Sequence, residues 1–139
     1  MRRGPATLGV VVAVLVAVVV GCSRADDPLE GTQWRLDEWT LSSLRPADFT
    51  ITAAFADGTI SGRSGVNSYS GPYETGSGGS FSVEALTSTE IAGPEPAMRA
   101  EGAYLTLLTQ ASSYELADGR LTLTDGNGNE LLIYRATSG

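Results

Sequence analysis

The 139-residue sequence contains no histidine and no lysine, and Cys22 is its single cysteine. A Ser-His-Asp triad needs a histidine base, whereas a serine–lysine dyad and a phosphate-binding P-loop each need a lysine. A zinc site would lack both of its preferred ligand types, and one cysteine cannot form an intramolecular disulfide. Sixteen acidic residues leave carboxylate pairs as the remaining acid–base chemistry, but such residues are usually solvated. We therefore predict no catalytic residues, no metal and no cofactor.

Residues 1–21 have the features of a bacterial lipoprotein signal peptide. Arg2 and Arg3 precede an apolar run, Leu8–Val20, that is thirteen residues long and too short to cross a bilayer as a helix. The run ends in Val19-Val20-Gly21-Cys22, which resembles a lipobox, where the cysteine thiol accepts a diacylglyceryl group. A short membrane anchor with an incidental cysteine is the alternative interpretation.

Cleavage before Cys22 would leave 118 residues, enough for one domain with a hydrophobic core. Two acyl chains on Cys22 would hold the protein at a membrane, and we expect it on the outer face of the cell membrane. We predict a tether over residues 22–28 and a domain over residues 29–136. Seven basic and sixteen acidic residues remain, a net charge of −9, which excludes nucleic acid as a partner. We expect a monomer.

Three dipeptides predict β-hairpins. Asp57-Gly58, Asp118-Gly119 and Asn127-Gly128 lie between alternating apolar segments and suit the positive φ angles of tight turns. The third register would set Asp125 opposite Glu130, an unfavourable pair that a longer loop would relieve. Further strands are expected around Thr32–Thr40 and Ser80–Leu86. The predicted cross-strand neighbours are Phe55 with Ile60, Leu116 with Leu121, Tyr114 with Leu123, Leu132 with Leu123, and Tyr134 with Leu121.

One helix is expected between these strands, over residues 93–111. Pro94 and Pro96 lie where a helix start tolerates proline. Apolar residues recur at helical spacing and predict a buried stripe; they are Met98, Tyr104, Leu105, Leu108 and Ala111. The fold class is therefore mainly β, on the border of α+β: a curved antiparallel sheet or partly open barrel of seven to eight strands with one packed helix.

The first predicted strand contains both tryptophans. Trp34 and Leu36 share one face, which we assign to the core, whereas Trp39 falls on the opposite face. Either a bulge returns Trp39 to the core, or its side chain is partly exposed.

The stretch SGRSGVNSYSGPY at residues 61–73 is unusually rich in glycine. Gly62 and Gly65 suit a bulge or a sharp corner of a sheet, and the amide of Asn67 can bond to nearby backbone. A ligand-binding loop is the alternative. We therefore take Asn67, Tyr69, Tyr73 and Trp39 as possible contacts for a ligand or partner.

Several short motifs occur along the chain in a fixed order. They are Leu29, Gly31, Thr32, Trp34 and Leu36, then Gly65, Asn67, Tyr69, Gly71 and Tyr73, then Thr89 and Ile91, then Glu101, Tyr104, Leu105 and Leu108, and finally Leu121 and Leu123. Their order and spacing, over about residues 29–134, resemble the META domain of bacterial envelope proteins. Val66 and Gly93 occupy the two positions where the family pattern has cysteine. This is expected if the two cysteines normally pair, so that the two positions lie together in the fold; two independent losses are the alternative.

The resemblance implies a small antiparallel β structure with one helix and an envelope protein linked to stress or secretion, without established catalytic residues. Two non-catalytic functions are compatible with it. The domain is either an interaction module that engages another envelope protein, or a carrier that binds an apolar ligand or lipid inside a partial barrel. The aromatic and leucine residues on the inward faces favour a filled interior and hence the interaction module.

Overall fold

The computed structural model describes residues 27–41 and 43–137. The predicted signal peptide and Cys22 lie outside the described residues. The described residues form nine strands, one α-helix and two short 3₁₀ helices, in the order β1 (Gln33–Trp39), η2 (Pro46–Asp48), β2 (Thr52–Ala56), β3 (Thr59–Arg63), β4 (Ser68–Gly76), η3 (Ser77–Gly79), β5 (Ser80–Val83), β6 (Thr87–Ser88), α1 (Glu95–Gln110), β7 (Ser113–Ala117), β8 (Arg120–Thr124) and β9 (Glu130–Ala136).

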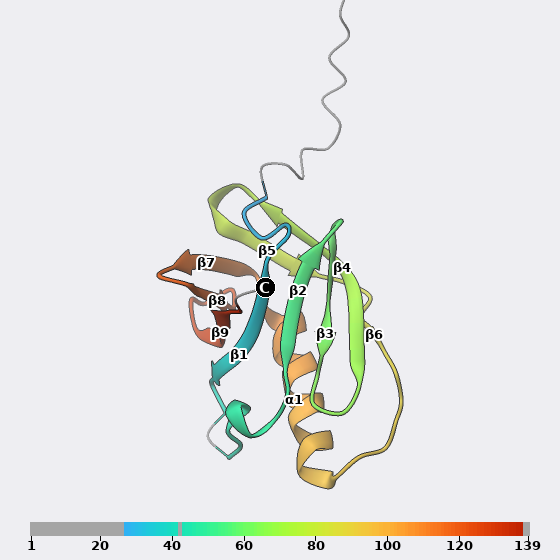
Figure 1. The fold of residues 1–139 in the computed structure, drawn as a ribbon. Helices are drawn as coiled ribbons and strands as arrows, with labels where there is room; N and C mark the ends of the chain where they lie inside the picture. The colour runs from blue at the N-terminus through green and yellow to red at the C-terminus, as the bar shows by residue number, and fades with distance from the viewer. Residues whose placement is uncertain (1–26, 42, 138–139) are drawn as a thin grey trace, which may run out of the picture.

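Eight of the strands close into an antiparallel barrel (Figure 1). Their order is β3-β2-β1-β9-β8-β7-β5-β4, and β3 pairs with β4 to complete the ring. The short strand β6 pairs separately with β4. The pairing between β5 and β7 consists of one residue pair, Ser80 with Ser113. The predicted fold class, mainly β with one packed helix, is confirmed, and the barrel is closed.

The first two Asp-Gly turns have the predicted geometry. Asp57 and Gly58 have φ angles of 54° and 73°, and Asp118 and Gly119 have 54° and 74°, as a type I′ turn requires. These turns set Phe55 opposite Ile60, Leu116 opposite Leu121, and Tyr114 opposite Leu123.

The third hairpin has the longer loop that its charges favour. A register shift after Leu123 places Thr124, instead of Asp125, opposite Glu130. The carboxylate of Asp125 accepts hydrogen bonds from the side-chain amide of Asn129 and from the backbone amides of Asn129 and Asn127, and these hold its pKa below the ordinary value. The predicted pairs of Leu132 with Leu123 and of Tyr134 with Leu121 are present.

A chain of tyrosine hydroxyls crosses the core. Tyr69 donates to the carbonyl of Thr52 at 2.7 Å, so Tyr104 donates to Tyr69 at 2.6 Å, and Tyr134 donates to Tyr104 at 2.9 Å. Burial raises the pKa of all three phenols, which therefore remain protonated. The surrounding interior is filled by buried side chains; among them are Trp34, Leu36, Ile51, Phe55, Ile60, Phe81, Leu108, Leu121, Leu123 and Leu132.

The helix packs on the barrel with most of the face that the sequence predicted. Tyr104, Leu108 and Ala111 are buried as expected, and Leu105 is partly buried against the core. Met98 is the exception and is 39% exposed. Ala100 and Glu101 are buried in its place, because the first turns of α1 dock against the glycine stretch rather than the barrel interior. In the part of the chain that the structure covers, no helix combines the length and apolarity needed to cross a membrane.

Candidate functional site

Asn67 is buried, and its side chain joins three segments of the domain. Its amide nitrogen donates to Glu101 Oε2 at 2.8 Å and to the Ile91 carbonyl at 3.1 Å. Its amide oxygen accepts from the Ile91 amide at 2.7 Å and from Thr89 Oγ1 at 2.8 Å. An asparagine amide has two donor and two acceptor positions, and all four are used within the domain.

Glu101 anchors the glycine stretch to α1. Its Oε1 accepts hydrogen bonds from Ser64 Oγ and from the Asn67 amide, both at 2.7 Å. Burial alone would raise the pKa of this carboxyl, but the bonds from Ser64 and Asn67 outweigh burial and lower the pKa below its ordinary value. We call Ser64, Asn67 and Glu101 the Glu101 clamp. Sequence reasoning missed this clamp, although Glu101 lies three residues from both Met98 and Tyr104, a spacing that places neighbouring side chains on one side of a helix.

Backbone geometry accounts for two glycines of this stretch. Gly65 has a φ of +117°, and a Cβ there would lie 3.1 Å from the Ala97 carbonyl oxygen of α1. A Cβ on Gly62 would lie 2.2 Å from the Thr52 carbonyl oxygen on the neighbouring strand. Glycine is therefore required for the corner to form and to dock on the helix.

Tyr69 and Tyr73, the other candidates in this stretch, are both buried. The hydroxyl of Tyr69 belongs to the tyrosine chain of the core. The hydroxyl of Tyr73 lies 2.6 Å from Asp27 Oδ2 and 2.9 Å from Glu30 Oε2. Burial, together with these two carboxylates, raises the pKa of Tyr73. Both side chains thus have partners within the domain.

Trp39 is the predicted candidate that lies at the surface. The register between β1 and β9 shifts between Leu36 and Glu38, so a bulge at Asp37 turns Trp39 toward the core. Its side chain is half-buried and packs against the core cluster, and its indole Nε1 donates to the Leu44 carbonyl at 2.8 Å. Both features considered from the sequence, a bulge and partial exposure, are therefore present.

An open groove of about 470 Å³ lies beside Trp39. We call it the Trp39 groove; it is lined by Asp37, Glu38, Trp39, Leu41, Leu44, Arg45, Pro46, Ala47 and Arg135. A smaller hollow of about 140 Å³ shares Glu38 and Trp39 with it. Sequence reasoning did not find the other lining residues. Asp37 and Glu38 are on β1, Arg135 is near the end of β9, and the rest come from the segment after β1.

The groove combines apolar and charged surfaces. Trp39, Leu41 and Leu44 supply its apolar wall, whereas Arg135 is held by Asp37 through an ion pair of 2.8 Å. Arg45 is exposed on the rim. Tryptophan and arginine are among the side chains most enriched at the energetic centres of protein interfaces.

Comparison with known proteins places this barrel in a family. The META domain model matches residues 27–138. The chain belongs to the META domain family. This META domain is similar to an NMR structure of a protein from Burkholderia xenovorans, with 28% identity and a TM-score of 0.67 over 83% of this chain and 88% of that one. No match was found among curated proteins.

Two more distant structures share the fold. A second NMR structure has 18% identity and a TM-score of 0.60, covering 78% of this chain and 92% of its own. A crystal structure of a DUF4847 family protein from Bacteroides vulgatus has 12% identity and a TM-score of 0.57, covering 80% and 96%. Neither the META family nor these structures indicate a catalytic activity.

The META pattern also explains the position of Val66. A Cβ built on Gly93 would lie 2.7 and 2.9 Å from the two Val66 methyl carbons and 3.4 Å from Val66 Cβ. The prediction that these two positions are neighbours is confirmed. Val66 therefore occupies the space above Gly93 where the family pattern places a second side chain.

Proposed function

We propose that this protein is an envelope lipoprotein whose META domain is a non-catalytic protein-interaction module, with the Trp39 groove as its contact site. The groove supports the proposal because a half-buried tryptophan and two exposed arginines line it together. The predicted contacts in the glycine stretch have their polar atoms bonded inside the domain, which leaves Trp39 as the candidate best placed to meet a partner. The META resemblance favours a role in envelope stress or secretion.

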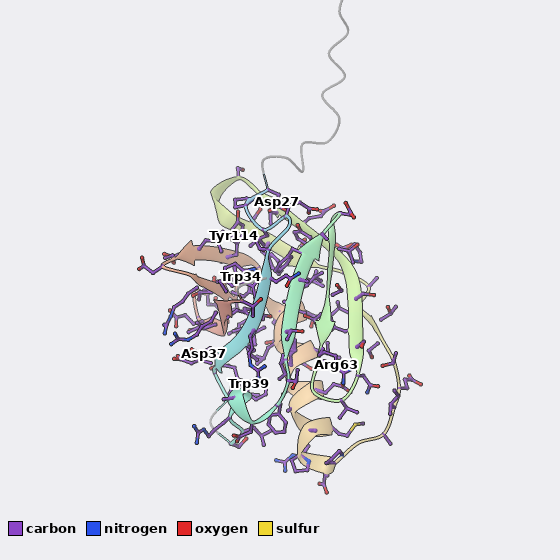
Figure 2. The ribbon with its side chains drawn as sticks, in the orientation of Figure 1. Asp27, Trp34, Asp37, Trp39, Arg63 and Tyr114 are labelled. Atoms are coloured by element: carbon purple, nitrogen blue, oxygen red, sulfur yellow. The ribbon has the colours of Figure 1, made fainter. Side chains whose placement is uncertain are left out.

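The position of the groove suits a membrane-anchored module. Asp27 and Trp39 lie at opposite ends of the barrel (Figure 2), separated by the length of β1. Four residues separate Cys22 from Asp27, so the five steps from one Cα atom to the next span at most about 18 Å when fully extended. Lipid on Cys22 would hold the Asp27 end near the membrane, so the Trp39 groove can face away from it.

The carrier function has less support. A carrier needs an enclosed apolar space, usually of several hundred Å³, whereas aromatic and leucine side chains fill the barrel interior. A groove of about 490 Å³ does lie beside Gly31, Trp34 and Ala136, but it is on the surface. Trp34 is only 6% exposed there, and its indole nitrogen donates to Thr32.

Cys22→Ser should abolish membrane anchoring. Without the thiol no diacylglyceryl group can be attached, so the variant should accumulate as the unprocessed precursor. Metabolic labelling with a radioactive fatty acid, followed by immunoprecipitation, measures this directly. Labelling that persists in Cys22→Ser would contradict the lipobox interpretation.

Trp39→Ala should remove a contact between the domain and its partner. A photo-crosslinking amino acid in place of Ala47, which is exposed and lines the groove, should give a discrete crosslinked species in intact cells. The same amino acid in place of Glu74, exposed on β4, is the control and should not. Trp39→Ala should eliminate the species, whereas Trp39→Phe, which keeps an aromatic anchor, should largely retain it. Equal crosslinking from both positions would reject the groove as the contact site.

A further inference from the structure

Three arginines form a row across three neighbouring strands. Arg35 of β1 is directly opposite Arg135 of β9, and Arg135 is directly opposite Arg120 of β8. Directly opposite residues project from the same face of a sheet. Because the adjacent residues Leu36 and Tyr134 are buried in the core, the row lies on the outside of the barrel. We call Arg35, Arg135 and Arg120 the arginine row.

Such a row is unfavourable in the isolated domain. Like charges directly opposite one another repel. The described residues include six arginines, and half of them belong to this row. Arg135 is paired with Asp37. Arg35 makes a long hydrogen bond of 3.4 Å to the Phe49 carbonyl. No ion pair involves Arg35 or Arg120 within residues 27–41 and 43–137, so both guanidinium groups are available to an anion.

The arginine row is continuous with the Trp39 groove. Arg135 belongs to both, since it sits in the centre of the row and also lines the groove. Arg45 stands on the groove rim. Asp37 and Trp39 are close to one another at the lower end of β1 in Figure 2. The combined surface thus offers cationic groups beside an apolar recess.

We propose that this surface recognises an acidic segment of a partner protein, with carboxylates on the arginine row and an apolar side chain in the Trp39 groove. The inference rests on the proposed interaction function and names the chemistry of the partner. Neighbouring strands are about 4.8 Å apart, and acidic residues one helical turn apart have Cβ atoms spaced by about 5–6 Å. An acidic helix can therefore match the row. Guanidinium–carboxylate pairs are strong and directional.

An acidic segment fits better than an anionic membrane. Asp37 and Glu38 adjoin the row, and the chain after the predicted cleavage site carries a net charge of −9. A broad anionic surface would meet these acids together with the arginines, and it would be repelled by the whole domain. A narrow segment can contact the row alone.

The test compares two double variants with the same change of charge. Arg35→Gln/Arg120→Gln removes two cations from the row but keeps the Arg135–Asp37 pair. Arg63→Gln/Arg99→Gln removes two exposed cations from β3 and α1 and is the control. The full chain, reconstituted in phosphatidylcholine nanodiscs, is titrated with a fluorescein-labelled peptide of glutamate and leucine, and binding is followed by fluorescence anisotropy. A peptide of glutamine and leucine checks the need for charge.

Wild type should bind the glutamate peptide in preference to the glutamine peptide, with an affinity that falls as salt is raised. The row variant should lose about tenfold or more in affinity, and the control variant about twofold or less. Equal losses in the two variants, or no binding of the glutamate peptide by wild type, would overturn the proposal. Row-dependent binding of phosphatidylglycerol vesicles without binding of the peptide would overturn it in favour of a lipid. Crosslinking from the Ala47 position that depends on Trp39 but not on the row would leave the proposed function standing and reject this inference alone.

Discussion

Glu101→Ala is expected to destabilise the domain by about 2 kcal/mol or more, because two buried donors lose their acceptor and each costs about 1–3 kcal/mol. The donors are the backbone amide and the side-chain amide of Asn67, whereas Ser64 Oγ keeps the Asn67 carbonyl as an acceptor at 3.0 Å. Single domains unfold with about 5–15 kcal/mol, so much of the total would be lost. Urea unfolding followed by circular dichroism measures the change.

A matched control separates the clamp from the loss of charge. Glu74→Ala removes an exposed acid from β4 and should change the unfolding midpoint little. If both variants behaved alike, the hydrogen bonds of Glu101 would not be the cause of the stability. Thermal unfolding of the two variants at one protein concentration gives the same comparison independently.

The same clamp predicts a dependence on acid. The pKa of Glu101 is lower in the folded protein than its ordinary value of 4.5, so ionised Glu101 stabilises the fold fully above about pH 4.5, and this contribution is lost as the pH falls through the folded pKa. Glu101→Gln cannot be protonated and should flatten the wild-type loss of stability in that range. An unchanged pH profile in Glu101→Gln would assign the acid sensitivity to other carboxylates.

Val66→Cys/Gly93→Cys is expected to form a disulfide that stabilises the domain by about 3–4 kcal/mol in the chain-entropy model, since it closes a loop of about 27 residues. The distance of 3.4 Å between Val66 Cβ and a Cβ on Gly93 is close to the usual range of about 3.5–4.5 Å. Thiol titration after mild oxidation, and melting curves with and without reductant, test both parts.

The single variants should reveal the close contact between these positions. Gly93→Ala alone should destabilise, because its Cβ would meet the Val66 methyl carbons at 2.7 and 2.9 Å. Combining it with Val66→Ala removes those methyl groups and should relieve the contact. The two changes should therefore be non-additive. Two free thiols in the oxidised double cysteine variant would show that the positions cannot be bridged.

The features that the sequence predicted best are those determined by residues close together in the chain. The two Asp-Gly turns determine their hairpins, because a two-residue turn leaves one register that keeps Phe55 and Leu121 on the core side. The longer loop before Glu130 was predicted from the repulsion between the Asp125 and Glu130 carboxylates alone. The closure of the barrel by β3 and β4 could not be predicted in this way, since it depends on the curvature of the whole sheet.

Interactions between distant segments account for what the sequence did not predict. Periodicity assigned Met98 to the core, but the docking of α1 on the glycine corner buries Glu101 instead. The buried Glu101 carboxylate requires hydrogen-bond donors from Ser64 and Asn67. The sequence of the helix itself does not show that these donors are present. Trp39 was recognised as a candidate, whereas Arg135 reaches the same groove from almost a hundred residues away in the chain.

The turn that precedes β1 determines how the domain bears mechanical load. Leu29 is fully buried, and Tyr73 of β4 holds both Asp27 and Glu30 through its hydroxyl. Glu30 also accepts hydrogen bonds from the backbone amides of Asp57 and Gly58 in the β2–β3 turn. A pulling force applied at Asp27 is therefore divided among β2, β3 and β4 before it reaches β1. The first strand, enclosed between β2 and β9, is thus shielded from being peeled off the sheet one hydrogen bond at a time.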